Sequence, residues 1–262
     1  MPHRKKTTAA AFAIAAFAII FLFCNPARCE DDAAIASQYY NRAVELHLSG
    51  NIYEAVGFYK KAIVLDPETA AYHADLGEAY RVTGQMREAI TELETAIQLE
   101  PSLVNAYTTL GVIMDREDLP QRAIEYHRAA IKIDPENYVA YNNLGHAYHS
   151  LGLIRAAIIN YKKSISLQND FAPAYDNLGM DLMLIGQAGE AAEAFKNAVK
   201  NAGDNHPQLG LYYNDLGAAY VALDKYQEAY EALKNAVRLM PDNNDIRLNM
   251  EFLGKKLNGK SN

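Results

Sequence analysis

The sequence predicts an all-α protein in which helical hairpins repeat every 34 residues and stack into a solenoid. Proline recurs at this spacing, each time after an apolar run that ends in an acidic residue, at Pro67, Pro101 and Pro135. A Leu-Gly pair recurs in the same register, at Leu76-Gly77, Leu110-Gly111, Leu144-Gly145 and Leu178-Gly179. Self-similarity at one fixed period of this length is the sequence signature of stacked helical repeats.

The fourth repeat shows how one hairpin is built. Tyr141, Leu144 and Tyr148 fall on one face of a first helix, which is the apolar pattern of a half-buried helix. Gly145 has no side chain, so another helix can approach it closely. Gly152 favours the turn that ends this helix and leads to the second one.

Some repeats vary this design. Asp118 and Asp224 stand where the other repeats have a turn glycine, and Pro120 stands at the start of a second helix, where proline is favoured. Four extra residues lengthen the period after the fifth repeat, so we expect a longer loop there.

The second repeat fills a known pattern with Leu76-Gly77, Tyr80, Ala89, Leu93, Ala96 and Pro101. Through six copies of this pattern, the chain resembles the tetratricopeptide repeat (TPR) proteins. The resemblance implies a right-handed α-solenoid of TPR helical hairpins. It also implies that the first helix of each hairpin lines a concave groove, where members of the family hold peptides or extended segments.

These patterns predict six repeats and a cap. The expected repeats are residues 36–69, 70–103, 104–137, 138–171, 172–209 with its extended loop, and 210–243. Residues 244–262 are expected to form a capping helix and tail, because a solenoid needs a lid over its last hairpin. The helix carries one apolar stripe, and Asp245 is placed to cap its start; the stripe is Ile246, Met250, Leu253 and Leu257.

The first 29 residues have the pattern of an export segment. Three basic residues precede an apolar run over residues 9–23, which has the length of a signal-peptide core and is short for a membrane-spanning helix. Cleavage before Glu30 would leave a linker over residues 30–35. We therefore expect a periplasmic or secreted protein. An uncleaved membrane anchor over residues 9–23 is the first alternative, and lipidation of a cysteine is the second.

The charge of the chain argues against nucleic acid as a partner. The net charge is −7, and residues 1–29 contain four basic and no acidic residues, so the remainder would carry −11. Nucleic-acid phosphates require a positive face. We expect contact with a membrane only through residues 9–23, if they are retained.

A ladder of small polar residues precedes the Leu-Gly position of each repeat, at Asn41, Asp75, Thr109, Asn143, Asn177 and Asp215. Asparagine donates and accepts hydrogen bonds at once, so such a ladder can bind an extended peptide backbone. The alternative is that these side chains satisfy only neighbouring groups or solvent. Further residues expected in the groove are Asn142, His146, His149 and Met180, with Val112 and Asp115 on the same face.

No motif predicts catalysis. The chain lacks a phosphate-binding glycine loop, a Gly-x-Ser-x-Gly motif and a His-Glu-x-x-His motif. His146 and His149, three residues apart on one helix, could share a metal ion, but no third ligand lies nearby in the sequence. We therefore predict no catalytic residue, no cofactor and no metal site.

The sequence thus predicts a non-catalytic, exported scaffold that binds a protein or peptide partner and supports assembly of a complex. Two other hypotheses stay open. One is self-association into a homo-oligomeric structural protein. The other is a membrane-anchored factor that assembles an envelope, pilus or secretion structure.

Overall fold

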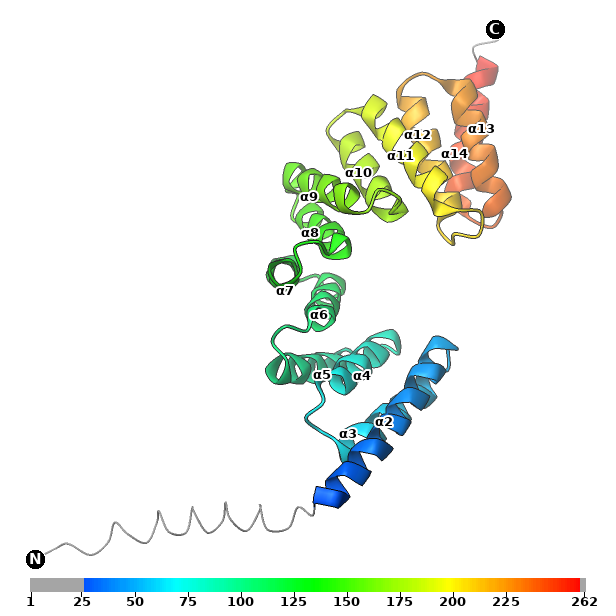
Figure 1. Ribbon diagram of the computed structural model, residues 1–262. Helices are drawn as coiled ribbons and strands as arrows, with labels where there is room; N and C mark the ends of the chain where they lie inside the picture. The colour runs from blue at the N-terminus through cyan, green and yellow to red at the C-terminus, as the bar shows by residue number, and fades with distance from the viewer. Residues whose placement is uncertain (1–25, 260–262) are drawn as a thin grey trace, which may run out of the picture. The chain divides into compact units, whose positions relative to one another are not determined.

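The computed structural model describes the backbone of residues 26–259 and the side chains of residues 31–257 (Figure 1). This range holds thirteen α-helices and no strand, so the predicted fold class, an all-α solenoid of TPR hairpins, is confirmed. The chain divides into two compact units, Met1–Ala106 and Tyr107–Asn262. The boundary between them lies within α6 (Val104–Arg116).

The first unit contains two hairpins in which each helix packs against the next. Its helices are α2 (Pro26–Leu48), α3 (Ile52–Leu65), α4 (Ala70–Val82) and α5 (Met86–Leu99). The stacking of α2 and α3 on α4 buries Ala36, Ala62 and Tyr72 in one apolar cluster.

Residues 30–35, which we expected to form a linker, are part of α2 and continue its helix. The helix starts at Pro26, and proline suits the first turn because its missing N–H needs no partner there. Asp31 and Asp32 lie in the second turn of the helix, and two alanines, which favour helix, come next. Residues 26–29 of the predicted export segment also belong to α2, and residues 1–25 lie outside the described range.

The second unit continues the same alternation of first and second helices. After α6 it contains α7 (Pro120–Ile133), α8 (Tyr138–Ser150), α9 (Ile154–Leu167), α10 (Ala172–Leu184), α11 (Ala188–Ala202), α12 (Leu209–Ala222), α13 (Tyr226–Leu239) and α14 (Asn244–Gly259). From α7 onward each helix packs on its successor, and the first helices α8, α10, α12 and α14 also contact one another in sequence.

The Leu-Gly glycines lie where the two helices of a hairpin touch. A Cβ added at Gly145 would lie 2.5 Å from a ring carbon of Tyr161, sixteen residues further along the chain. The same clash, at 2.3–2.8 Å, recurs in the other repeats. The pairs are Gly77 with Leu93, Gly111 with His127, Gly179 with Phe195, and Gly217 with Leu233. In these five repeats the facing side chain occupies the space of a Cβ, which favours glycine, whereas the first repeat carries Ala43 at this position.

The turn prediction is also confirmed. Gly152 ends α8 with φ of +70°, and Asp118 and Asp224 adopt φ of +56° and +57° at the matching positions. Aspartate is one of the few residues other than glycine that tolerate this left-handed region. Pro120 occupies the first turn of α7, as expected.

The helix α14 covers the last hairpin. Ile246 and Leu253 are fully buried, and Leu253 packs in a cluster with Ala229 and Leu233 of α13. The expected cap is wrong by two residues: Asn243, not Asp245, caps the helix. Its Oδ1 accepts hydrogen bonds from the backbone N–H of Asp245 (3.0 Å) and of Ile246 (3.2 Å), which are the second and third residues of the helix.

Within the described range, no helix combines the length and the apolar composition that crossing a bilayer would require.

Candidate functional site

A hollow of about 330 Å³ lies on the first helices of repeats 3, 4 and 5, within the second unit. Its lining comes from three helices at equivalent positions, because each repeat presents the same helix face one period further along. The lining residues are Val112, Asp115 and Arg116 of α6, Asn142, Asn143 and His146 of α8, and Asn177 of α10. Four of the ten residues predicted for the groove thus gather around one opening.

Three of these side chains form an amide relay. Asn177 Nδ2 donates to Asn142 Oδ1 at 2.9 Å, and Asn142 Nδ2 donates to Asn143 Oδ1 at 3.3 Å. Asn142 is only 7% exposed and holds the centre of the relay. The relay uses the oxygen of Asn143 and the nitrogen of Asn177. The relay therefore does not use the amide nitrogen of Asn143 or the side-chain oxygen of Asn177.

A buried histidine positions the acidic residue of the hollow. His127 is fully buried beneath Gly111, and its Nε2 lies 3.1 Å from Asp115 Oδ2. Asp115 Oδ1 is shielded from solvent and has no partner within the described residues. The wall of the hollow thus carries a carboxylate held in one orientation, beside the cationic Arg116.

The two predicted groove histidines have different roles. His146 is exposed and lines the hollow, whereas His149 Nδ1 lies 2.5 Å from Asp181 Oδ1 and so links α8 to α10. Asp181 is fully buried; burial raises the pKa of its carboxyl, while the hydrogen bond and charge of His149 lower it. The two imidazole rings stack with centroids 6.5 Å apart. Over the described residues, no three His, Cys, Asp or Glu side chains gather closely enough to hold a metal ion.

The other predicted groove residues lie elsewhere. Asn41 is exposed on α2 and Asp75 is half-buried on α4, both in the first unit. In the second unit Thr109 is half-buried, Met180 is 40% exposed, and Asp215 accepts a hydrogen bond from Asn214 Nδ2 at 3.1 Å. None of these five lines the hollow.

Hydrogen bonds between consecutive repeats were not predicted. At three junctions the fifth residue of one repeat bonds the sixth residue of the next, 35 positions later, and we call each pair of residues at these two positions a rung. Tyr40 Oη donates to Asp75 Oδ2 at 2.7 Å, Asn177 Nδ2 donates to Asn142 Oδ1 at 2.9 Å, and Asn249 Nδ2 donates to Asn214 Oδ1 at 2.8 Å. Burial raises the pKa of Asp75, and the bond from Tyr40 lowers it.

The rungs explain part of the polar ladder without a ligand. Asp75 and Asn177 bind the preceding repeat, as the alternative interpretation of the ladder expected. Arg116 and Asn249 escaped the sequence reasoning. Residue spacing alone does not say which first-helix side chains meet across repeats, although polar residues at the fifth and sixth positions were the available signal.

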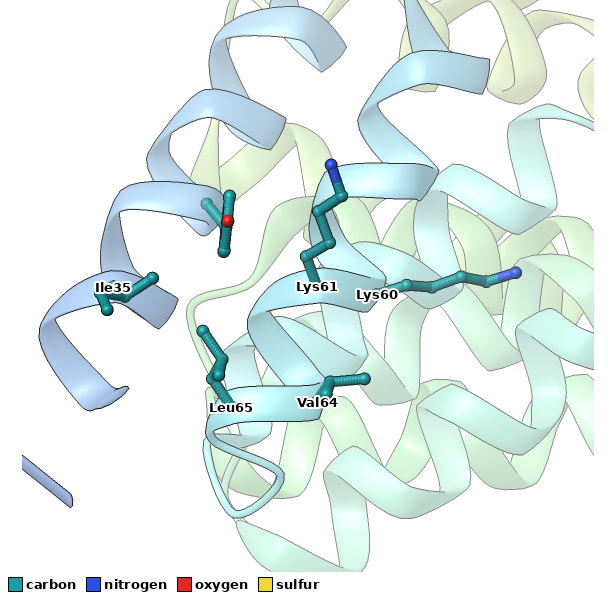
Figure 2. Close-up of a pocket in the computed structure, with 6 residues that line it drawn as sticks. Ile35, Lys60, Lys61, Val64 and Leu65 are labelled. Atoms are coloured by element: carbon teal, nitrogen blue, oxygen red, sulfur yellow. The ribbon is translucent and has the colours of Figure 1, made fainter. Parts of the chain in front are cut away.

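A second opening lies in the first hairpin. Figure 2 shows Ile35 on α2 and Leu65 on α3 beside this cleft of about 360 Å³, with Lys61 next to it. The cleft is apolar and is also lined by Tyr39, Lys60 and Val64. The Lys61 ammonium lies 5.6 Å from the ring centroid of Tyr39, within range of a cation–π contact. No residue predicted for the groove lines this cleft.

Three family models match separate stretches of the chain. Two describe a tetratricopeptide repeat and match residues 170–242 and 138–171, and one describes a TPR repeat and matches residues 77–116. No curated protein matches the chain closely enough to be reported as a relative.

Solved structures share the fold. The crystal structure of PilW, a widely conserved type IV pilus biogenesis factor, matches with a TM-score of 0.72 and 22% identity, covering 82% of this chain and 97% of that one. YrrB, a TPR protein with an unusual peptide-binding site, matches with a TM-score of 0.56 and 20% identity. The match covers 74% of this chain and 97% of YrrB.

The MamA protein is more similar in sequence, at 30% identity and a TM-score of 0.55. The match covers 63% of this chain and 91% of MamA. Repeat models match three stretches of the chain, MamA is 30% identical to it, and its helices stack as hairpins. This chain belongs to the tetratricopeptide repeat family.

Proposed function

We propose that the chain is a non-catalytic scaffold that binds an extended segment of a protein partner along the first helices of repeats 3 to 5. The TPR fold is an architecture for protein–protein interaction, because its stacked helices leave one long inner surface open. The observation that carries the proposal is the amide relay. It fixes Asn143 and Asn177 and uses neither the amide nitrogen of Asn143 nor the side-chain oxygen of Asn177.

A peptide backbone matches this pair. Each residue of an extended chain offers one N–H and one C=O, so the Asn143 donor and the Asn177 acceptor can bind the backbone whatever the side chains are. Asp115, Arg116 and His146 around the same hollow add charged and polar contacts that can select among sequences.

Binding to selected peptides tests the proposal. Peptides are selected from a random library on the wild-type chain, and their affinities are then measured for the Asn143→Ala, Asn177→Ala double variant. Each lost hydrogen bond contributes about 1 kcal/mol, so we expect affinity to fall about tenfold or more. The matched control is Asn205→Ala, which removes an exposed asparagine from the loop before α12. Equal affinity of the double variant and the control would refute the assignment.

We propose that the chain acts outside the cytoplasm, in the periplasm or after secretion. The pattern of residues 1–29 supports this location, and a membrane anchor over residues 9–23 is the alternative. PilW makes assembly of an envelope or pilus structure the process to examine first. The mass of the natural protein checks the location: we expect a mature chain that starts at Glu30. A chain that retains residues 9–23 would favour the anchored assembly factor instead.

A further inference from the structure

Two rungs of the second unit share one chemical design. In both, an asparagine at the fifth position accepts an N–H from the sixth residue of the next repeat. These are Asn142 with Asn177, and Asn214 with Asn249. The accepting asparagine also donates to its own neighbour in the chain, Asn142 to Asn143 and Asn214 to Asp215.

The rung between repeats 5 and 6 breaks this design. Its fifth-position residue is Asp176 and its sixth-position partner is Asp215, 39 positions later because of the four extra residues in the loop. The helices α10 and α12 that carry them are in contact. Neither ionised carboxylate has a hydrogen to donate. Asp176 Oδ1 is shielded from solvent and has no hydrogen-bond partner within the described residues.

We propose that the rung between Asp176 and Asp215 closes only when one of the two carboxyl groups holds a proton, so that protonation regulates the contact between α10 and α12. Asn177 is the next residue after Asp176 and forms one end of the hollow. Opening of the rung would therefore disturb the amide relay. This second step rests on the proposed function, whereas the protonation of the rung does not.

Carboxyl chemistry supports the closed form. A protonated carboxyl becomes an O–H donor that the other carboxylate can accept, whereas two charged carboxylates at close range repel each other. Burial, followed by the charge of Asp215, raises the pKa of Asp176 to about 7. Burial also raises the pKa of Asp215, while the hydrogen bond from Asn214 lowers it. Because the two carboxyl groups interact, the proton is taken up by the pair as a whole and not by one fixed residue.

The raised pKa of Asp176 comes from burial and from the charge of Asp215, with no positive charge contributing. His206, in the loop before α12, has its ring centroid 5.4 Å from that of Tyr212. Tyr212 of α12 is the other titratable group that interacts with Asp176; burial and the charge of Asp176 raise its pKa to about 12, so it stays neutral. Over the described residues, no Lys, Arg or His of α8, α9, α11 or α12 is among the groups that shift the pKa of Asp176. A proton on either carboxyl group would neutralise one of the two charges and supply the missing donor.

The direction of the pH effect follows from the raised pKa. A carboxyl with a higher pKa in the folded chain than in the unfolded chain takes up a proton on folding. Stability should then fall as the pH rises from about 4, the ordinary carboxyl pKa, to about 7, and level off above that.

Urea unfolding of the full chain tests the rung. In Asp176→Asn, the new amide can donate to Asp215, as Asn177 donates to Asn142. We expect the wild-type midpoint to fall between about pH 5 and about pH 8, and the fall to be at least halved in Asp176→Asn. Asp204→Asn removes the same charge from the exposed loop between α11 and α12 and should keep the wild-type fall. Asp215→Asn serves as a second variant if Asp176→Asn loses its helical circular dichroism. An unchanged fall in the folded variant would overturn the proposal.

Peptide affinity tests the regulatory step. For a peptide selected on the wild-type chain, we expect severalfold weaker binding at about pH 8 than at about pH 5, and a smaller difference for Asp176→Asn. Equal wild-type affinity at both pH values would overturn the link to the hollow. Failure to obtain any binding peptide would count against the proposed function, while the unfolding midpoints would still decide the rung.

Discussion

Single residues determine how closely the two helices of a hairpin pack together. Gly145 is the clearest case, because a Cβ there would lie 2.5 Å from the buried ring of Tyr161. The ring cannot move away easily, since Tyr161 is 1% exposed and packs in the main cluster of the second unit. The same contact occurs in five repeats with four kinds of facing side chain, Leu, His, Tyr and Phe. In these five repeats the glycine is constant while its partner varies.

Substitution at Gly145 should reveal this constraint. Gly145→Ala is expected to lower the free energy of unfolding by about 1–3 kcal/mol, the usual cost of overpacking. Gly57→Ala is the matched control, because Gly57 also lies within a helix but has nothing within 4 Å of an added Cβ. It should be neutral or gain about 0.5–1 kcal/mol from helix propensity. Urea unfolding measures both variants, and an equal effect would show that the close contact is unimportant.

The sequence predicted the residues around the hollow better than their bonds. The family resemblance and the repeat register placed Asn142, Asn143, His146 and Asn177 on the groove face, but they placed Asn41, Asp75, Thr109 and Asp215 there equally, and these four do not line the hollow. The relay does not follow from the register. Whether Asn177 binds a ligand or the preceding repeat depends on the distance between α8 and α10, which side-chain packing decides.

At the scale of helices, boundaries are set by capping side chains. Asn243, Asn244 and Asp245 are all chemically able to cap α14, so the sequence could not distinguish among them. Backbone geometry selects Asn243, whose oxygen reaches two free N–H groups of the first turn. Likewise, residues 30–35 join α2 because they contain no glycine or proline that would break a helix.

Two alanine variants compare these capping assignments. Asn243→Ala should cost about 1 kcal/mol of stability, because it leaves the first-turn N–H groups without their acceptor. Asp245→Ala should cost less, about 0.3 kcal/mol, since Asp245 is exposed and acts only through the helix dipole. Thermal unfolding measures the difference. A larger loss in Asp245→Ala would restore the original sequence-based assignment.

At the scale of the whole molecule, the repeat period predicted the fold class and the alternation of first and second helices. It did not predict the division into units, because the boundary within α6 interrupts no motif. Nor did it predict the three hydrogen-bonded rungs, since each joins residues 35 positions apart and depends on how the hairpins stack. The repeat register assigns a side chain to one face of a helix. The stacking of the hairpins decides where on that face it lies and what it contacts.

The central claim is that a partner segment occupies the hollow of repeats 3 to 5. Photo-crosslinking to a selected peptide tests it most directly, with a photoreactive residue placed in turn at His146, at Ile35 and at Asn205. His146 is exposed at the hollow, Ile35 lines the first-hairpin cleft, and Asn205 lies in an exposed loop. We predict crosslinking from position 146 and background yields from the other two. A higher yield from position 35 or 205 than from position 146 would contradict the account.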